Sequence, residues 1–398
     1  MNPDLNSLQP YPFEKLAQLK SCVTPPAHLN HIALSVGEPK HPTPKIITDA
    51  LVNNLQGLGQ YPNTRGIDSL RETIAAWLCK QFGIETTDIS PHDHVLPVSG
   101  TREALFSFAQ CIIDSTQQGI VAMPNPFYQI YEGAALLAGA QPHFINCDES
   151  NHYLPNYDDV DESIWKKCQL LYICNPGNPS GAVHSNTQLR NLIKLAHRYN
   201  FIIAADECYS EIYPENGIKP TGLLEASTNM GNKNFARCVV FHSLSKRSNA
   251  PGLRSGFVAG DPSVINEYFR YRTYHGCTLP VPTQHASIAA WSDETHVEHN
   301  RALYQQKFDT VINIIGDNMS LNRPDAGFYL WAKTPIADDL FAQQLFEQQN
   351  MTVLPGQYLS RDTAQGNPGK NHIRMALVAP VEECIEAANR INNFIQSL

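Results

Sequence analysis

The chain has 398 residues, of which 42% are hydrophobic and 17% are charged, and its formal net charge at pH 7 is -9. This length excludes a small disulfide-stapled module, and the low charged fraction indicates an extensive interior that is compatible with a buried subunit interface. The excess of acidic residues argues against sequence-independent nucleic-acid binding, which requires a basic face that displaces counterions.

Helix and strand patterns alternate from about residue 66. Apolar side chains such as Leu70 and Leu78 fall on one helical face, and residues 101–113 predict a second helix after a Ser-Gly turn. Ser185 and Gln188 have the spacing of a capping box, which predicts the start of a further helix. Four apolar runs predict strands that are buried on both faces: residues 120–123, 169–174, 201–205 and 238–242.

This alternation predicts right-handed crossovers and an α/β domain with a mainly parallel sheet between helices, which we place at residues 46–288. The two ends of the chain differ from this pattern. Residues 1–45 are proline-rich and are expected to be irregular, and residues 289–398 mix helical patterns with short strands such as residues 327–331 and 372–375. We therefore expect a smaller α+β domain that is built from both termini.

Polar residues follow three of the apolar runs, at the carboxyl ends of strands where ligands bind in open α/β sheets. Asp206 follows one run, Ser243 and Lys246 follow another, and the loop of residues 175–181 follows a third. A lysine near low-dielectric surroundings and other cations has a lowered pKa and is nucleophilic, although the commoner fate of a lysine is a solvated surface. A carboxylate that closes an apolar run needs a cation, either on a ligand or in a structural ion pair.

Five motifs occur in one characteristic order and spacing. They are Ser99-Gly100-Thr101, the Asn-Pro-x-Asn-Pro-x-Gly loop at 175–181, Asp206-x-x-Tyr209, Ser243-x-Ser245-Lys246, and Arg254 eight residues further on. Over essentially the whole chain this pattern resembles the fold-type I, pyridoxal-phosphate-dependent aminotransferases of classes I and II. The resemblance implies a seven-stranded sheet, pyridoxal 5'-phosphate as the cofactor, a homodimer with shared active sites, and ping-pong transfer of an amino group between amino acids and 2-oxo acids.

The resemblance also assigns contacts to the cofactor ring. Lys246 forms the Schiff base and moves the substrate proton, and Asp206 pairs with the protonated pyridine nitrogen. Tyr209 and Asn178 bond the phenolic oxygen, and Tyr128 stacks on the ring. The alternatives are a packed core aromatic for Tyr209, a turn residue for Asn178, and a neighbouring ring, Phe127 or Tyr131, in the place of Tyr128.

The cofactor phosphate is expected at the start of the helix that follows Ser99 and Gly100, because free N–H groups and the helix dipole favour an anion there. The resemblance adds its other phosphate ligands: the backbone of Thr101 and Arg102, the side chains of Ser243, Ser245 and Arg254, and Tyr61 from the other subunit. An ordinary helix N-cap, a surface ion pair at Arg254 and a turn-capping role for Tyr61 stay open as alternatives.

The α-carboxylate of the substrate is expected to bind Arg374, which resembles the bidentate arginine near the C-terminus of these enzymes. Asn178 and the backbone N–H of Gly37 resemble its helpers, although Gly37 fits a simple turn almost equally well. No metal ligand is expected at this site.

The closest resemblance within the family is to the N-succinyldiaminopimelate aminotransferases, through residues 1–16 and 245–257. It implies glutamate as the amino donor and a step in lysine biosynthesis. Arg65, Arg272 and the backbone near residues 10–12 are the candidates for binding the succinyl group.

Other activities share the same cofactor motifs. Aspartate, alanine and kynurenine or other aromatic aminotransferases, and some lyases, differ in their pocket walls rather than in Lys246 or Asp206. Aminotransferase-like domains also sense ligands in transcription regulators, but those carry an additional N-terminal winged-helix domain of roughly 60 residues, and here the cofactor motifs begin too early for one.

The ten cysteines are scattered without metal-ligand spacing and are expected to be small apolar fillers in a reducing compartment. The N-terminus has neither a basic nor an apolar targeting segment, and no apolar run approaches the roughly 20 residues that cross a bilayer. We therefore expect a soluble cytoplasmic protein without membrane or nucleic-acid partners.

Overall fold

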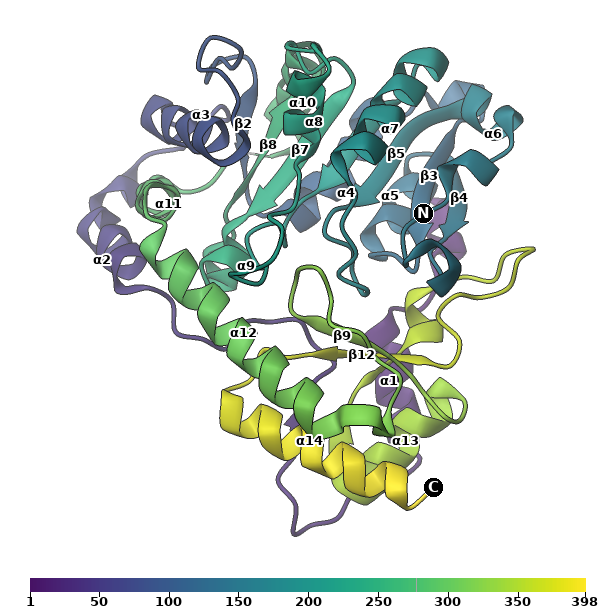
Figure 1. Cartoon of the computed structure of the whole chain (residues 1–398). Helices are drawn as coiled ribbons and strands as arrows, with labels where there is room; N and C mark the ends of the chain where they lie inside the picture. The colour runs from purple at the N-terminus through teal and green to yellow at the C-terminus, as the bar shows by residue number, and fades with distance from the viewer. Residues whose placement is uncertain (277) are drawn as a thin grey trace.

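The computed structural model describes residues 1–276 and 278–398, and its centre is a seven-stranded sheet (Figure 1). In spatial order the strands are β2 (Val95–Val98), β8 (Gly256–Gly260), β7 (Cys238–Ser243), β6 (Ile202–Asp206), β5 (Cys168–Cys174), β3 (Ile120–Asn125) and β4 (Gln141–Asn146). Only β8 runs antiparallel to its neighbours. The prediction of a mainly parallel seven-stranded sheet is confirmed.

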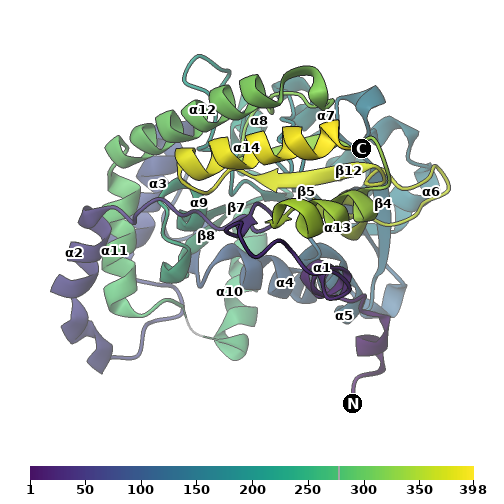
Figure 2. The same ribbon diagram turned by 90° about the horizontal axis from the view of Figure 1, so that it is seen from below.

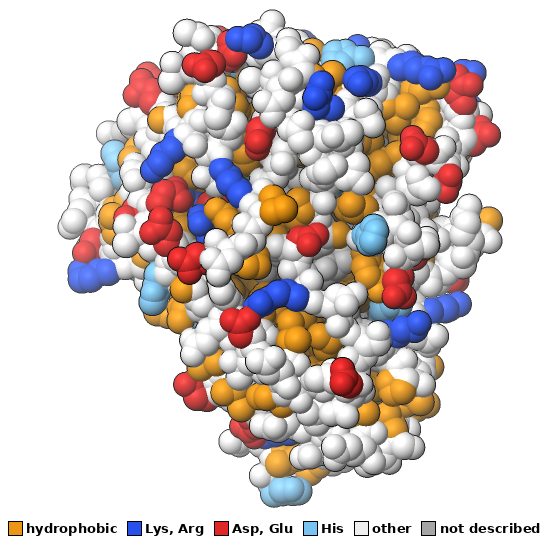
Figure 3. All heavy atoms as spheres, viewed as in Figure 1, with side chains coloured by type: hydrophobic (Ala, Val, Ile, Leu, Met, Phe, Trp, Pro, Cys, Tyr) orange, Lys and Arg blue, Asp and Glu red, His pale blue; other side chains and the backbone are white. Residues whose placement is uncertain are grey.

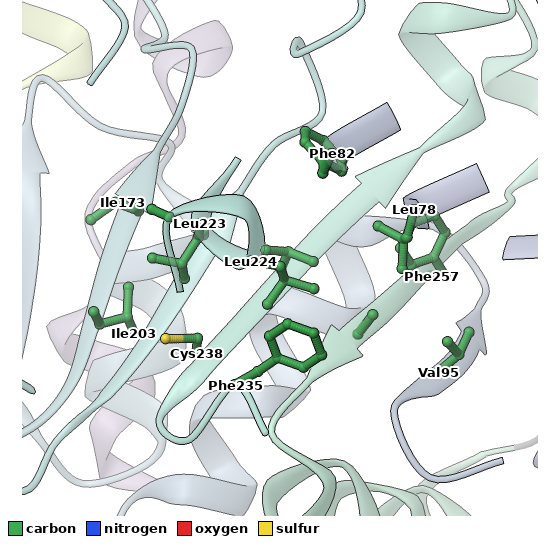
Figure 4. Packing of buried hydrophobic residues seen from close by; sticks show 14 of the residues in the cluster. Leu78, Phe82, Val95, Ile173, Ile203, Leu223, Leu224, Phe235, Cys238 and Phe257 are labelled. Carbon is green, nitrogen blue, oxygen red and sulfur yellow. The ribbon is translucent and has the colours of Figure 1, made fainter. Parts of the chain in front are cut away.

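Helices cover both faces of this sheet. The face in Figure 4 packs against α3 (Asp68–Phe82), α6 (Glu162–Lys167), α7 (Asn186–Tyr199), α8 (Leu223–Asn229) and α11 (Val281–Ser292). The other face packs against α4 (Thr101–Ile112), α5 (Ile130–Leu137) and α10 (Pro262–His275). Successive strand residues alternate between the two cores, since Val240 packs on the first and Val239 on the second. This alternation explains why the strands read as uninterrupted apolar runs.

The predicted capping box begins α7. The backbone N–H of Gln188 donates to Ser185 Oγ at 3.3 Å, and Ser185 N–H donates to Gln188 Oε1 at 2.8 Å. Two otherwise unpaired backbone N–H groups are thereby satisfied, so the helix starts where the sequence predicts it.

A second unit combines segments from both ends of the chain. A three-stranded antiparallel sheet, in the order β11 (Leu354–Pro355), β12 (His372–Ala376) and β9 (Tyr329–Lys333), shares a core with α12 (Thr295–Ile315), α13 (Asp338–Gln349) and α14 (Val381–Gln396). Strand β1 (Ile32–Ala33) pairs in parallel with β10 (Met351–Thr352). Figure 2 shows α1, α13 and α14 on this side of the molecule.

The expectation that residues 1–45 are irregular is wrong for α1 (Pro12–Lys20). A proline is compatible with the first turn of a helix, where its missing N–H has no partner to lose. Glu14 accepts a hydrogen bond from Tyr11 N–H at 3.2 Å, and Leu16 packs with Trp331 and Leu359. The predicted domain limits at 45/46 and 288/289 fall within α2 (Lys45–Asn53) and α11 and stay predictions.

Basic and acidic side chains are interspersed on the face of the molecule shown in Figure 3. No helix within residues 1–276 and 278–398 is both long enough and apolar enough to cross a membrane. The nine cysteines in these ranges are free thiols, and five of them are buried: Cys147, Cys168, Cys174, Cys238 and Cys384. Cys277 lies outside the described residues.

Candidate active site

The carboxyl ends of four adjacent parallel strands, β7, β6, β5 and β3, meet at one edge of the large sheet. Next to them lies a cavity of about 400 Å³. It is lined by most of the predicted site residues: Gly37, Thr101, Arg102, Tyr128, Asn178, Asp206, Tyr209, Ser243, Ser245, Lys246, Arg254 and Arg374. Pockets of this volume hold cofactors and drug-sized ligands.

Three predicted residues, Ser99, Gly100 and Tyr61, are not among those that line the cavity. Gly100 precedes α4 with φ = 89°, and a Cβ atom on it would overlap the guanidinium of Arg254. Gly100 therefore lets Arg254 approach the helix N-terminus. The side chain of Tyr61 is fully exposed.

Lys246 lies in the short helix α9 (Leu244–Arg247), directly after β7. Its Nζ donates to the carbonyl oxygen of Gly37 and lies 5.4 Å from the centroid of the Phe328 ring. Burial, with a smaller contribution from the nearby Arg374, lowers the pKa of Lys246 from 10.5 to about 8. An appreciable fraction of this amine is therefore uncharged and nucleophilic in mildly alkaline solution.

Asp206 at the end of β6 is 5% exposed. Tyr131 Oη donates to its Oδ2 at 2.7 Å, and Cys208 N–H donates to its Oδ1 at 3.4 Å. Within the described part of the chain no lysine, arginine or histidine nitrogen lies within 4 Å of this carboxylate. Burial raises the pKa of Asp206. A buried carboxylate that lines a cavity and has no cationic side chain within 4 Å among the described residues fits a ligand with a protonated nitrogen, as the pyridine ring provides.

Arg374 in β12 is buried, and hydrogen bonds orient its guanidinium. Its Nη1 donates to Asn178 Oδ1 at 3.0 Å and its Nη2 donates to the carbonyl of Ser35 at 2.8 Å. The guanidinium lies 4.4 Å from the centroid of the Tyr329 ring. Tyr329 also contacts Gly37 so closely that a Cβ atom at Gly37 would overlap its hydroxyl. Gly37 thus has a steric reason beyond a simple turn.

Hydroxyl and guanidinium groups gather at the start of α4. Ser243 Oγ donates to Ser245 Oγ at 2.9 Å and accepts from Ser245 N–H at 3.1 Å. Arg254 Nη1 donates to the carbonyl of Pro251 at 3.0 Å, which leaves its remaining N–H groups for a ligand. Two hydroxyls, a guanidinium and a helix N-terminus form a suitable cradle for a phosphate dianion.

The three aromatic candidates for ring stacking are separated by burial. Tyr128 lines the cavity, whereas Phe127 and Tyr131 are 1% and 0% exposed in the core. Tyr209 also lines the cavity, and its hydroxyl lies 3.0 Å from that of Tyr329. Burial raises the pKa of Tyr209 well above 10, so its hydroxyl stays protonated and can donate.

Sequence reasoning missed the side chain of Arg102, which it expected to act through its backbone. Arg102 Nε donates to Tyr128 Oη at 2.7 Å, and Nη2 donates to Tyr11 Oη at 2.9 Å. The hydrogen bond that Arg102 donates to Tyr128 is the main reason why the pKa of Arg102 is raised. A fixed cation therefore borders the cavity beside two tyrosines.

Other lining residues were also missed: Tyr11, Phe13, Val36, Gln129, Cys208, Pro251, Tyr329 and Leu359. Cys208 lies inside the Asp206-x-x-Tyr209 motif, and Tyr11 lies in a segment that the sequence singled out only for its backbone. Phe13 and Leu359 carry no chemical signal, because an apolar pocket wall reads like any core residue.

Arg65 and Arg272, the two arginines considered for a succinyl group, do not line the cavity. Arg272 is 1% exposed, and its Nη1 donates to both oxygens of Glu103 at 2.9 and 3.0 Å. Arg65 donates to the carbonyl of His92 at 2.7 Å. In this chain the two guanidiniums have structural partners elsewhere.

Comparison with known proteins agrees with this geometry. The family model for class I and II aminotransferases matches residues 30–391. An aminotransferase of known structure from Neisseria meningitidis is 45% identical, with a TM-score of 0.93 over 98% of this chain and 99% of that chain. Aminotransferase AspB from Helicobacter pylori is 35% identical, with a TM-score of 0.90 over 98% of this chain and 100% of that chain.

A sequence relative, the LL-diaminopimelate aminotransferase of Dehalococcoides mccartyi, is 30% identical over 92% of both chains. Members of the matched family use pyridoxal phosphate and act on amino acids and keto acids. Since the family match spans nearly the whole chain, this protein belongs to the class I and II aminotransferases.

Proposed function

We propose that this aminotransferase moves an amino group between glutamate and N-succinyl-2-amino-6-oxopimelate, forming 2-oxoglutarate and N-succinyl-LL-2,6-diaminopimelate in lysine biosynthesis. The charge of the cavity carries the proposal. Its described lining holds four cations, Arg102, Lys246, Arg254 and Arg374, and Asp206 is the only acid among them. With one arginine for the phosphate and one for the α-carboxylate, Arg102 is left for a carboxylate at the far end of a longer substrate.

The proposed roles follow from where each side chain lies. Bound pyridoxal phosphate would supply the electron sink for a carbanion at the substrate α-carbon. Lys246 would hold the cofactor through its amine, and the free amine would move the proton at the α-carbon. Arg374 and Asn178 hold the α-carboxylate, and Asp206 holds the pyridine nitrogen.

The remaining cofactor contacts are proposed from where the residues lie around the cavity. Tyr128 covers one face of the ring, and Tyr209 and Asn178 donate to its phenolic oxygen. The phosphate binds at the N-terminus of α4 beside Ser99 and Gly100, through the backbone N–H groups of Thr101 and Arg102 and the side chains of Ser243, Ser245 and Arg254. The helix dipole and the serine hydroxyls stabilise this anion.

Unblocked LL-diaminopimelate is the second candidate substrate, because the similar curated proteins are LL-diaminopimelate aminotransferases. The far end of that molecule carries an ammonium group beside its carboxylate. A carboxylate is the side chain that stabilises an ammonium best, and the described cavity lining offers none besides Asp206. Succinylation converts the ammonium to a neutral amide and adds a carboxylate, which suits Arg102 better.

Replacing Arg102 tests this assignment. Arg102→Gln removes a hydrogen bond between charged groups, worth roughly 1.5–3 kcal/mol, so we expect kcat/KM for the succinylated substrate to fall about 10- to 150-fold. The rate with alanine, which has no distal carboxylate, should change less than about twofold. Arg270→Gln removes an exposed arginine whose ion pair with Glu267 spans 3.4 Å, and it serves as the matched control.

The activity of the wild-type protein with a panel of substrates identifies the preferred substrate. The panel contains the succinylated and the free diaminopimelates with 2-oxoglutarate, together with aspartate, alanine, N-acetylornithine and kynurenine. A clear advantage of the free diaminopimelate would replace the succinyl assignment, and equal loss of the alanine and succinyl-substrate activities in Arg102→Gln would refute the role of Arg102.

We also propose a homodimer in which Tyr61 reaches the phosphate of the neighbouring subunit, as dimers are typical of this family. Tyr61 is fully exposed, and Val52, Leu55 and Leu58 in the preceding segment are 47–65% exposed, which is unusual for large apolar side chains outside an interface. Likewise, separate cores support a large domain of residues 46–288 and a small domain of residues 1–45 and 289–398.

Subunit mixing tests the shared site. Lys246→Ala and Tyr61→Ala subunits are each impaired alone, but a hybrid dimer contains one site with both wild-type residues. Random mixing should therefore restore about a quarter of the wild-type activity, since half of the dimers are hybrids with one intact site. If Tyr61 acts within its own subunit, mixing restores nothing.

A further inference from the structure

The segment Ser35–His41, which we call the strap, crosses the candidate active site between β1 and α2, within the chain that joins α1 to α2 in Figure 2. It is hydrogen-bonded to two residues of the site and, at its far end, to α12. The carbonyl of Ser35 accepts from Arg374 at 2.8 Å, and the carbonyl of Gly37 accepts from Lys246. His41 at its far end bonds Asn300 of α12 at 2.8 Å. The strap therefore contacts both the residue proposed to bind the α-carboxylate and the reactive lysine.

Behind the strap lies a buried lysine that the reaction does not use. Lys307 of α12 is 2% exposed, and in the described ranges no carboxylate lies within 4 Å of its Nζ. The Nζ atom is 2.6 Å from His41 Nε2 and donates to the carbonyl of Val378 at 3.3 Å. Burial lowers the pKa of Lys307 to about 8. Burying a cation without a counter-ion costs several kcal/mol, so its position calls for a reason.

Donor and acceptor chemistry gives the hydrogen bonds around His41 a single direction. An ammonium only donates, so His41 Nε2 is the acceptor from Lys307 and the proton of the neutral ring resides on Nδ1. His41 Nδ1–H then donates to Asn300 Oδ1, which also accepts from Asn249 Nδ2 at 3.1 Å.

This series of hydrogen bonds ends on the backbone of the turn that contains the reactive lysine, Lys246. Asn300 Nδ2 donates to the carbonyl of Lys246 at 3.2 Å and to that of Arg247 at 3.4 Å. Asn300 is 2% exposed, and its amide oxygen and nitrogen are thus both committed. One amide joins the strap, through His41, to the turn that holds Lys246.

We infer that His41 and Lys307 are positioning residues, which fix the strap against Asn300 and thereby set Gly37 and Ser35 relative to Lys246 and Arg374. Neither residue lines the cavity, so neither touches substrate. Lys307 acts by holding His41 in the one tautomer that donates to Asn300. The inference rests on the proposed roles of Lys246 and Arg374 but not on the identity of the longer substrate.

Graded substitutions at His41 separate positioning from simple packing. His41→Leu removes the bond to Asn300, and we expect the KM for the amino donor to rise about tenfold with less than about a twofold change in kcat. His41→Asn keeps a side-chain N–H where Nδ1 lies and should restore KM to within about threefold of wild type. Lys307→Met leaves the ring free to change tautomer and should raise KM about three- to tenfold.

The matched control is His31→Leu. His31 lies on the same N-terminal segment and bonds Thr352 at 2.7 Å, away from the cavity. A second readout does not depend on turnover: amide hydrogen exchange of residues 35–41 in the cofactor-free protein should accelerate in His41→Leu and Lys307→Met but not in His31→Leu.

Wild-type KM and exchange in both His41→Leu and Lys307→Met overturn the inference, as does an equal rise in KM in His31→Leu. Should His41→Leu not fold, Lys307→Met and His41→Asn decide alone by the same criteria. The proposed amino donor is tested separately, because a wild-type protein that is inactive with glutamate refutes glutamate as the donor. In that case the KM values of the variants are measured with the best amino donor of the panel.

Discussion

Lys246→Ala is expected to lose the visible absorbance of the covalently bound cofactor and to lower the turnover number by about 10⁴-fold or more, because it removes both the nucleophile and the proton carrier. The measurement is a spectrum of protein purified with pyridoxal phosphate, together with the single-turnover rate with glutamate. Transamination within tenfold of wild type would exclude Lys246 as the reactive amine.

The variant should stay folded, since burying the charged amine of Lys246 costs free energy and its removal relieves that cost. Removing it should leave the thermal midpoint of the cofactor-free protein unchanged or slightly higher. An unfolded variant would make the loss of turnover uninformative, so Lys246→Met, which keeps most of the side-chain volume, is prepared in parallel.

The pH dependence of cofactor loading gives a second test of Lys246. Burial lowers its pKa from 10.5 to about 8, so the neutral amine predominates above about pH 8. The rate at which the cofactor-free protein takes up pyridoxal phosphate should therefore rise with pH and level off above about 8. A rate that keeps rising toward pH 10.5 would indicate a solvated lysine.

Asp206→Asn is expected to have the second largest effect. Breaking a buried ion pair by removing one partner costs about 3–5 kcal/mol, which corresponds to roughly a 10²- to 10⁴-fold loss in the rate of the half-reaction. The cofactor should also bind more weakly. Stopped-flow reaction with glutamate and equilibrium dialysis of the cofactor measure these two quantities separately.

Tyr131→Phe provides the graded comparison for Asp206. It deletes only the 2.7 Å hydrogen bond to Oδ2 and leaves the charge in place. We expect the rate of the half-reaction to fall about tenfold, clearly less than in Asp206→Asn. The cofactor-free Asp206→Asn protein should be at least as stable as wild type, because a neutral amide is easier to bury. Asp206→Asn turning over within about threefold of wild type would leave Asp206 with a structural role only.

Much of the large sheet was predictable because its inner strands are apolar on both faces. Three strands gave no such signal. β8 contains Gly256 and Gly260, where a Cβ atom would collide with the backbone of β7, and glycine reads as a strand breaker. β2 contains Pro97, and β4 is an edge strand with exposed polar residues such as Gln141. Their pairing depends on neighbours that are distant in sequence.

The same limit applies to the candidate site. Residues at strand ends, such as Asp206 and Lys246, could be named because their local pattern carries the information. The contacts of Asn300, Tyr329 and the strap could not, since they join segments 51 to 339 residues apart along the chain. Arg102 was predicted to act through its backbone, and the role of its side chain could not be read from the sequence, because the direction of a side chain at a helix start depends on the tyrosines it contacts.

The parallel pairing of β1 with β10 constrains how the protein can be made. Ile32 must wait for Met351, so the N-terminal segment stays unpaired while about 320 residues are synthesised. At roughly 5–20 residues per second this takes about 15–60 s, during which the contiguous strands of the large sheet can already assemble on the ribosome. The sheet edge that carries the candidate active site would then fold early, and the strap would reach its final position last. A nascent chain therefore remains inactive until its final helices emerge.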